Sequence, residues 1–199
     1  METNRPEYPA EWYDEVYHGD HVKKVRYHLP AEKSSYFPLW NQAVGWIKQL
    51  PHPSVFDLGC GTGQFMDLAY RSGIVVTGGV DFSSEAIKMC QERIPTHAIL
   101  FSVQNLNQRP YTWLRPSSAI TLFEVLEHIL DDLSVLEALP SGQNIIFSVP
   151  SFKCENHVRL FQTPKEIEDR YAGLLNIKSS IPFRKKHVIW LCNAEKKIT

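Results

Sequence analysis

The feature that most constrains this chain is an apolar segment ending in three closely spaced glycines, Val55-Phe56-Asp57-Leu58-Gly59-Cys60-Gly61-Thr62-Gly63. The apolar part predicts a buried strand, and glycine tolerates the φ values of a tight turn that other residues resist. Residues 65–71, which follow, have the spacing of a helix. Such a unit places backbone N–H groups and a helix N-terminus beside a ligand. We therefore expect the loop to bind a polar or anionic small molecule at close range.

The glycine spacing decides between two kinds of ligand. The dinucleotide fingerprint is G-x-G-x-x-G, whose third glycine lets helix and sheet pack closely. Counted from Gly59 the third place holds Gln64, and counted from Gly61 it holds Met66, so neither frame fits. The observed D-x-G-x-G-x-G order instead resembles motif I of the class I methyltransferases that use S-adenosylmethionine (SAM).

That resemblance implies how the loop binds the cofactor. In the family the loop packs against the methionine part of SAM, and the acid at the place of Asp57 helps to hold its ammonium group. A zwitterionic ligand suits a turn that offers N–H donors and one carboxylate. The loop residues that the resemblance assigns to the cofactor are Asp57, Gly59, Cys60, Gly61 and Gly63.

A second apolar segment, residues 74–80, ends in Asp81 and Phe82. An acid at the end of the second strand of such a sheet lies beside the glycine loop and can accept hydrogen bonds from both ribose hydroxyls. Asp81 and Phe82 are therefore predicted cofactor residues, with a turn or helix cap as the alternative role of Asp81. Ser83 or Ser84 then caps a helix.

A third segment matches the family pattern less closely. Residues 97–103 predict a strand, and Asn105 follows it where the family usually carries an aspartate that accepts from the adenine amino group. The amide oxygen of Asn105 can accept the same hydrogen bond without the charge. A plain polar loop residue is the alternative.

Strands alternate with helices along the chain, which predicts an α/β fold with a mostly parallel sheet. The last two expected strands, residues 174–181 and 187–192, have no helix between them and so indicate an antiparallel hairpin. We expect a three-layer Rossmann-like sandwich whose mostly parallel seven-stranded sheet carries an antiparallel C-terminal hairpin strand. The other expected elements are strands at 118–123 and 144–149, and helices at 39–49, at 130–139 and from Thr163-Pro164 onward.

The length of 199 residues and the hydrophobic content of 43% suit one core. We expect one structural domain overall, in which residues 41–199 form the SAM-binding domain. Residues 1–40, rich in aromatic side chains, are expected to form a helical lid. Tyr13, Tyr17 and His18 are candidate pocket members there, and packing onto the sheet is the alternative.

Charge and cysteine content narrow the partners. The net charge is −1 and the only dense basic run is Arg184-Lys185-Lys186, which weighs against a broad nucleic-acid footprint but leaves a small RNA substrate open. The four scattered cysteines have no metal-knuckle spacing and indicate reduced thiols in a cytoplasm. We also expect no signal peptide and no membrane span, hence a cytoplasmic protein.

A second candidate site is the segment from Phe123 to His128, at the end of the expected fourth strand. Ligands of open α/β sheets bind outside the carboxyl ends of the strands, so this segment is expected to face the reaction, with Phe123 at the cofactor. If it coils into a helix, Glu124, Glu127 and His128 share one face. Two carboxylates and an imidazole can bind a divalent metal or supply a general base.

The pattern Glu-x-x-Glu-His with a later histidine resembles the ubiquinone-pathway O-methyltransferases and, more closely, the small-RNA 2′-O-methyltransferases. In the latter, two glutamates and two histidines hold a metal beside the ribose hydroxyl. The resemblance thus implies Glu124, Glu127, His128 and His157 as metal ligands. Many methyltransferases carry E-V-L-E-H without a known metal. A catalytic role of His128 and Glu124 without metal, and a purely structural role, therefore stay open.

The expected chemistry is an in-line displacement at the sulfonium methyl, for which the protein supplies alignment and a dry pocket. A hydroxyl acceptor must also lose its proton, and His128 is the candidate base. We expect a SAM-dependent methyltransferase that acts on a small-molecule acceptor, with O-methylation preferred. The alternatives are a metal-assisted RNA 2′-O-methyltransferase and a catalytically idle cofactor-binding partner subunit.

Overall fold

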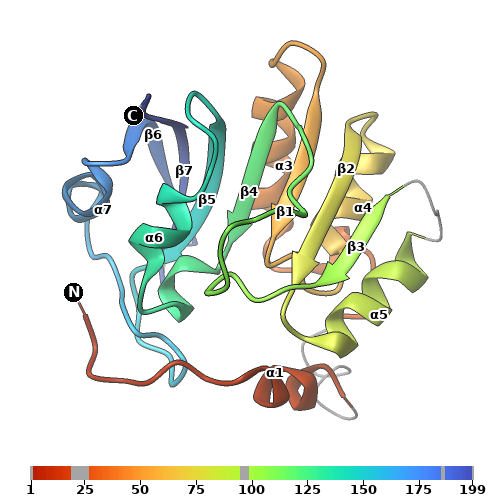
Figure 1. The fold of residues 1–199 in the computed structure, drawn as a ribbon, viewed down its shortest axis with the longest axis horizontal. Helices are drawn as coiled ribbons and strands as arrows, with labels where there is room; N and C mark the ends of the chain where they lie inside the picture. Colours follow the sequence, from red (N-terminus) through yellow and green to blue (C-terminus); the bar gives the residue numbers. More distant parts are fainter. Residues whose placement is uncertain (1, 19–26, 95–98, 185–186, 199) are drawn as a thin grey trace. The chain divides into compact units, whose positions relative to one another are not determined.

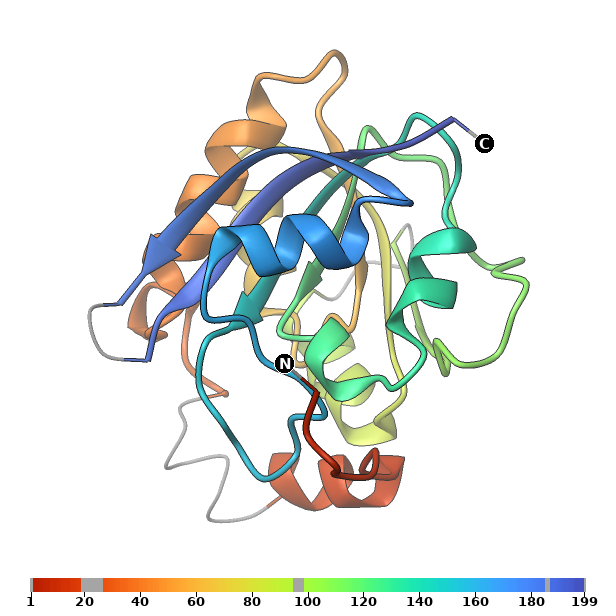
Figure 2. The ribbon, with the colours of Figure 1, turned by 90° about the vertical axis from the view of Figure 1, so that its left-hand side faces the viewer.

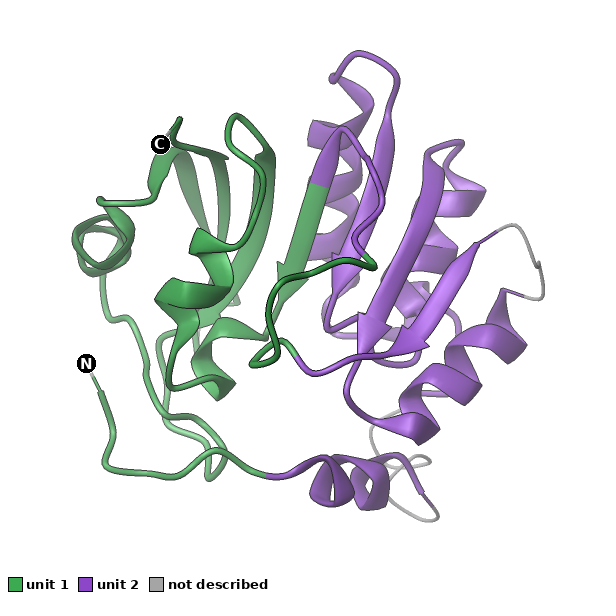
Figure 3. Cartoon of the chain, in the orientation of Figure 1, with its two compact units in different colours: residues 1–8, 106–113, 120–199 green, residues 9–105, 114–119 purple. Residues whose placement is uncertain are grey.

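The computed structural model describes residues 2–18, 27–94, 99–184 and 187–198. The chain forms two compact units (Figure 3). Unit 1 comprises residues 1–8, 106–113 and 120–199, and unit 2 comprises residues 9–105 and 114–119. The glycine loop lies in unit 2, whereas the segment from Glu124 to His128 lies in unit 1. The lid boundary expected at residue 40 stays a prediction.

A seven-stranded sheet has the order β3-β2-β1-β4-β5-β7-β6 (Figure 1). In unit 2, β2 pairs in parallel with β1 on one side and β3 on the other. In unit 1, β7 pairs antiparallel with both β5 and β6. The predicted α/β class, with a mostly parallel Rossmann-like sheet and an antiparallel C-terminal hairpin, is confirmed. The strands are β1 (Ser54–Leu58), β2 (Val75–Asp81), β3 (Leu100–Val103), β4 (Ala119–Phe123), β5 (Asn144–Pro150), β6 (Leu175–Phe183) and β7 (Ile189–Lys196).

Helices flank the strands within each unit. In unit 2, α4 packs on β2 and α5 packs on both β2 and β3. In unit 1, α7 contacts β6, and Figure 2 shows it running along the hairpin strands. The described helices are α1 (Ala10–Tyr17), η1 (Ala31–Lys33), α3 (Phe37–Lys48), α4 (Gln64–Arg71), α5 (Ser84–Arg93), η2 (Leu126–His128), α6 (Asp132–Glu137) and α7 (Pro164–Tyr171).

Two helix starts follow the rules that predicted them. The Ser83 hydroxyl accepts from the N–H of Ala86 at 3.1 Å, so of the two candidate serines it is Ser83 that caps α5. The Thr163 hydroxyl accepts from the N–H of Glu166 at 3.3 Å, and Pro164 fills the first position of α7. A serine or threonine oxygen at this place satisfies an N–H that the helix itself leaves unpaired.

Several strands and helices begin or end at other residues than expected. The third strand begins at Leu100, and the first residues expected for it, 97 and 98, lie outside the described part of the chain. β6 continues to Phe183 because Pro182 sits on an edge strand, where a missing N–H is tolerated. β7 spans 189–196 rather than 187–192. The helix expected at 130–139 is confined to 132–137.

Residues 124–128 do not form one helix, so the condition for a shared helix face is not met. Glu124 adopts a left-handed φ of 55°, and a single 3-10 turn follows at Leu126–His128. A non-glycine residue with positive φ reverses the chain direction locally, so the three- and four-residue spacing does not place these side chains on one helix face. Among the described residues, no helix combines the length and the apolar character needed to cross a membrane.

Candidate active site

The loop between β1 and α4 is a turn made by glycine. Gly59, Gly61 and Gly63 have φ values of 74°, 51° and 74°. The N–H groups of Gly59 and Cys60 both donate to the carbonyl of Val80, at 2.7 and 2.9 Å. The loop is therefore bound directly to the end of β2.

The glycines also permit close approach. A Cβ added at Gly63 would lie 2.5 Å from the Sγ of Cys90 and 3.3 Å from its Cα, so α5 closes this side of the loop. Among the described residues, a Cβ added at Gly61 would meet only the hydroxyl of Tyr17, at 3.4 Å. Gly63 thus serves the packing of α4 against α5, whereas Gly61 lies under α1.

Asp81, at the end of β2, contacts the glycine loop. One of its carboxylate oxygens, Oδ2, accepts from the N–H of Gly61 at 2.9 Å, and Oδ1 accepts from the N–H of Ser83 at 2.9 Å. Burial raises the pKa of Asp81 to about 6, against the N–H groups that favour its charged form. Asp81 therefore lies beside the loop, where its spacing predicted it, and it also holds the loop in place. Its contact with a ribose stays a prediction.

Helix α1 covers this end of unit 2. The ring of Tyr13 lies 4.8 Å from that of Phe82, and burial together with the charge of Asp81 raises the pKa of Tyr17 well above its ordinary value. The carboxylate of Asp14 accepts from the Ser83 hydroxyl and, at 3.2 Å, from the N–H of Glu85. Asp14 therefore fixes α1 to the start of α5. Sequence reasoning missed it, although an acid amid aromatic residues was the available signal.

Arg93, at the end of α5, was also missed. Its guanidinium donates to three backbone carbonyls, those of Thr62 at 2.9 Å, Leu29 at 3.2 Å and Tyr27 at 2.6 Å. The side chain of Gln64 donates to the same Leu29 carbonyl at 2.7 Å. Arg93 thus joins the glycine loop to the segment that precedes α3.

The remaining predicted cofactor residues, and His18 of the predicted lid pocket, lie in different parts of the structure. Asp57 is buried in β1, Asn105 is exposed just after β3, and His18 is exposed at the end of α1 with Nε2 3.6 Å from Glu85 Oε1. Phe123 is the last residue of β4. The ammonium, adenine and ring contacts assigned to them stay predictions.

In unit 1 the chain turns sharply after β4. The N–H of Glu124 donates to the hydroxyl oxygen of Ser148 at 2.9 Å, and that hydroxyl donates to Glu124 Oε1 at 2.8 Å. This reciprocal pair directs the Glu124 carboxylate toward β5. Two residues later the η2 turn presents Glu127 and His128.

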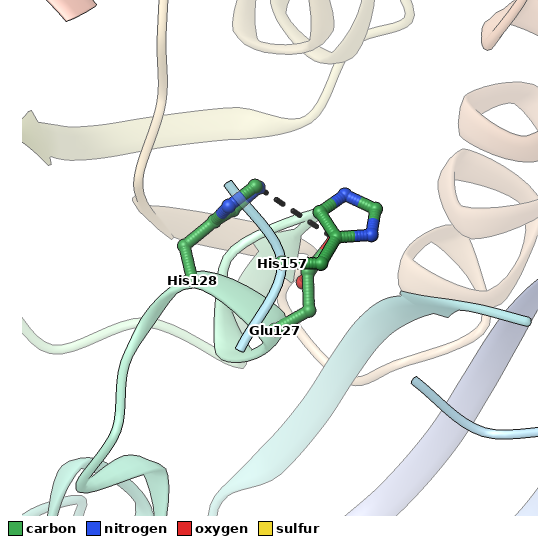
Figure 4. A group of neighbouring side chains, drawn as sticks. All are labelled: Glu127, His128 and His157. Atoms are coloured by element: carbon green, nitrogen blue, oxygen red, sulfur yellow. Dashed lines mark ion pairs between the residues drawn. The ribbon is translucent and has the colours of Figure 1, made fainter. Parts of the chain in front are cut away.

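Glu127, His128 and His157 form a compact cluster (Figure 4). One potential ligand atom of each lies within 4.8 Å of those of the other two. The two imidazole rings have their centroids 5.1 Å apart. The N–H of Val158 donates to the carbonyl of Glu127 at 2.8 Å, so the segment that carries His157 is bound directly to the η2 turn.

Backbone carbonyls set the tautomer of both histidines. Nδ1 of His128 lies 2.9 Å from the carbonyl oxygen of Asn156, and Nδ1 of His157 lies 3.1 Å from that of Phe152. Because a carbonyl only accepts, each Nδ1 carries the hydrogen and each Nε2 carries the lone pair. Burial lowers the pKa of His128 to about 4 and also lowers that of His157. Both rings are therefore neutral at pH 7.

Glu127 is a fully buried acid, and no described residue donates a hydrogen bond to either of its carboxylate oxygens. Burial, and then the negative charge of Glu124, raise its pKa well above the ordinary range. Its Oε1 lies 3.8 Å from His128 Nε2, an ion-pair distance, but the lowered pKa of His128 leaves the imidazole uncharged at pH 7, and the raised pKa of Glu127 shifts that carboxyl toward its protonated form. The cluster thus joins a buried carboxyl group to two imidazole lone pairs.

These donors suit a divalent cation. Metal-bound histidines usually donate their other ring N–H to a carbonyl or carboxylate, as both rings do here. A carboxylate with unsatisfied oxygens and two imidazole nitrogens is a common ligand set for first-row metals. The structure brings together three of the four predicted ligands, Glu127, His128 and His157, while Glu124 lies outside the group and bonds to Ser148.

Known proteins share this fold. A family model described as a methyltransferase domain matches residues 22–176. The magnesium protoporphyrin IX methyltransferase ChlM from Synechocystis PCC 6803, solved with bound SAM, is 16% identical over 98% of this chain and 100% of its own, with a TM-score of 0.71. The methyltransferase domain of bacterial CtHen1-C is 19% identical over 80% of this chain and 97% of its own, with a TM-score of 0.63.

A third similar structure is the N-methyltransferase NodS from Bradyrhizobium japonicum WM9, in complex with S-adenosylhomocysteine (SAH). It is 13% identical over 78% of this chain and 86% of its own, with a TM-score of 0.58. No curated protein matches the sequence. At these identities the three likenesses concern the fold.

Proposed function

The chain belongs to the methyltransferase-domain family, and on that premise we propose that it transfers the methyl group of SAM to a hydroxyl group of a small-molecule acceptor. SAM is supported by the D-x-G-x-G-x-G loop from Asp57 to Gly63 and by similar structures that hold SAM or SAH. The preference for a hydroxyl is carried by one observation, the hydrogen bond that leaves the lone pair of the His128 imidazole on Nε2. Its Nδ1 is bound to a carbonyl, so its Nε2 is the atom that can take a proton.

The methionine part and the ribose of the cofactor are assigned to residues of unit 2. Backbone N–H groups of the glycine loop and the carboxylate of Asp57 suit the zwitterionic methionine part, and Asp81 suits the ribose hydroxyls. The four cysteines are free thiols, the state that a reducing compartment maintains, which supports a cytoplasmic location as part of the same proposal.

The acceptor chemistry is assigned to unit 1. The acceptor oxygen attacks the sulfonium methyl, the carbon–sulfur bond breaks, and SAH leaves with the electron pair on sulfur. The hydroxyl proton passes to Nε2 of His128 and later to solvent. A neutral amine acceptor needs no base for its attack, so a base held neutral at pH 7 favours oxygen over nitrogen.

A matched pair of histidine variants tests the role of His128. His128→Asn retains an N–H donor for the Asn156 carbonyl but removes the basic nitrogen, whereas His52→Asn alters an exposed histidine. We expect His128→Asn to lower kcat on a hydroxyl acceptor by about 10²- to 10⁴-fold, the usual contribution of a general base. The loss should shrink at high pH, where the acceptor ionises unaided. Equal activity of the two variants would exclude His128 as the base.

A metal-assisted reaction is the second candidate, because both oxygens of the buried Glu127 have no hydrogen-bond donor among the described residues. Glu127, His128 and His157 would hold the ion, which when bound would polarise an acceptor hydroxyl and lower its pKa. The Glu-x-x-Glu-His resemblance extends this candidate to the 2′-hydroxyl of a small RNA.

Cobalt(II) absorption measures this site without turnover. We expect the wild type and the exposed-residue control Glu155→Gln to give the same saturable visible spectrum on Co²⁺ titration, and Glu127→Gln to give none. If the wild type gives no spectrum and a chelator leaves turnover unchanged, the metal candidate is wrong. Activity on ribose 2′-hydroxyls alone would replace the small-molecule acceptor by RNA.

A further inference from the structure

Arg159 is an almost completely buried arginine, with 1% of its surface exposed, two residues after His157. Its guanidinium donates to the backbone carbonyls of Leu126 and Ile129 through Nη1 and to that of Leu130 at 2.8 Å through Nη2. These three carbonyls flank Glu127 and His128 along the chain. One side chain therefore binds both ends of the η2 turn.

A buried carboxylate balances the charge of Arg159. Asp132 Oδ2 lies 3.3 Å from Arg159 Nη1 and accepts from the hydroxyl of Tyr171 at 2.8 Å. The same carboxylate receives two hydrogen bonds from Arg170, at 2.6 and 2.8 Å, from the less buried side. Asp132 is thus shared by two arginines, of which Arg159 reaches the turn and Arg170 reaches Glu2.

The backbone of Arg159 belongs to the segment that carries His157. The neighbouring Val158 donates to the Glu127 carbonyl, and Thr3 contacts the outer side of the segment through the carbonyls of His157 and Val158, both at 2.7 Å. Arg159 therefore connects the two pieces of chain that supply the cluster. The side chain of Arg159 itself spans from the segment that contains His157 to the η2 turn that contains Glu127.

A buried arginine contributes little net stability to a fold, because removing its charge from water costs free energy. Desolvation of a buried ion pair often offsets its attraction, and apolar replacements of similar volume are frequently neutral or stabilising. The fork of a guanidinium does something that an apolar side chain does not, because it binds several acceptors in fixed directions. In Arg159 the acceptors that the guanidinium binds are the backbone carbonyls around the cluster.

We propose that Arg159 is a positioning residue, which fixes Glu127 and His128 relative to His157 so that the cluster keeps one geometry during methyl transfer. This role rests on the proposed function of the cluster. Arg159 acts through the backbone of the turn and not on the acceptor. Displacing a reacting group by about 1 Å can cost about 10²-fold in rate, so a small change at this support is measurable in turnover.

Arg159→Lys, with Arg170→Lys as the matched control, separates positioning from stability. Lysine retains the positive charge beside Asp132 but replaces the planar fork by a point charge. We expect Arg159→Lys to lower kcat about 10- to 100-fold while the Kd of SAM stays within about twofold, because the glycine loop and Asp81, to which the methionine part and the ribose are assigned, belong to unit 2. Arg170→Lys, which keeps the contacts of Arg159 to the turn, should retain kcat even where it lowers the urea midpoint.

A spectroscopic readout at constant pH accompanies the kinetics. Long-range ¹H–¹⁵N spectra of the wild type and of Arg170→Lys should show His128 and His157 as single Nδ1–H tautomers. Arg159→Lys should show a mixture of tautomers at His128. If Arg159→Lys retains both kcat and the single tautomer, or if Arg170→Lys loses them equally, the positioning role is wrong.

The wild type decides the question if Arg159→Lys does not fold. A guanidinium held by three carbonyls rotates slowly and gives separate Nη–H signals, whereas averaged signals from Arg159 would overturn the inference. These spectra need no turnover. Failure of the proposed hydroxyl chemistry with Arg159 still rigid is thus distinguishable from failure of the positioning role itself.

Discussion

Gly63→Ala probes the packing of the glycine loop in a way that the structure makes quantitative. The added Cβ would lie 2.5 Å from Cys90 Sγ, a separation at which either the loop or α5 must move. The residue also keeps a φ of 74°, which L side chains resist. Two separate penalties therefore act at one position, one conformational and one steric.

Gly142→Ala isolates the first penalty, because Gly142 has the same φ of 74° and no atom of the described residues lies within 4 Å of an added Cβ. A left-handed conformation costs an L residue about 1 to 2 kcal/mol. Overpacking a tight contact adds about 1 to 3 kcal/mol. We expect Gly142→Ala to lose the first amount only and Gly63→Ala to lose about 2 to 5 kcal/mol of unfolding free energy.

The assay is urea unfolding followed by tryptophan fluorescence, with SAM titration calorimetry on the same samples. In the Cys90→Ala background the 2.5 Å clash with Sγ is removed and only the contacts at 3.3 Å with Cα and Cβ of residue 90 remain, so the double-mutant cycle should give a coupling of about 1 to 3 kcal/mol. The Kd of SAM should rise at least about tenfold in Gly63→Ala and stay unchanged in Gly142→Ala. Equal losses in the two single variants, or zero coupling with Cys90, would refute the packing argument.

Further predictions concern the same units. If ribose hydroxyls donate to the charged carboxylate of Asp81, SAM binding should lower the pKa of this residue from about 6. Calorimetry should then find full affinity for SAM above pH 6 and a fall in affinity that approaches about tenfold per pH unit below it. A pH-independent Kd would contradict the ribose contact. Arg93→Gln removes most of a clamp on three carbonyls and should raise the Kd of SAM about tenfold, while the exposed Lys88→Gln on the same helix should not. Thr163→Ala should lower the unfolding free energy by about 1 kcal/mol through loss of the α7 cap and leave the Kd of SAM unchanged, and a stability equal to wild type would deny the cap.

Local patterns predicted the parts of the fold that depend on near neighbours. The glycine loop, the end of β2 at Asp81 and the two capped helices are set by steric and capping rules that act over a few residues. The alternation of strands and helices predicted the mostly parallel sheet, because each strand and helix is recognisable from its own local pattern. Boundaries failed where distant groups intervene, as at the start of α6, where Arg159 takes up the carbonyls of residues 129 and 130.

The candidate site was predictable only in part. The helical spacing of Glu124, Glu127 and His128 gave no sign of the left-handed Glu124, because the Ser148 hydroxyl that holds it comes from another strand. Arg93 and Arg159 were missed because their carbonyl acceptors lie about 30 or more residues away, and a carbonyl carries no sequence signature.

Transfer of a labelled methyl group tests the central claim most directly. The purified protein is incubated with SAM carrying a ¹³C-methyl group and a panel of small hydroxyl and amine acceptors, and the position of the label is read by NMR. Hydroxyl transfer predicts SAH formation with the label on oxygen. A label on nitrogen or carbon would contradict the assigned chemistry, and tight SAM binding with no labelled product from any acceptor would identify an idle cofactor-binding subunit instead.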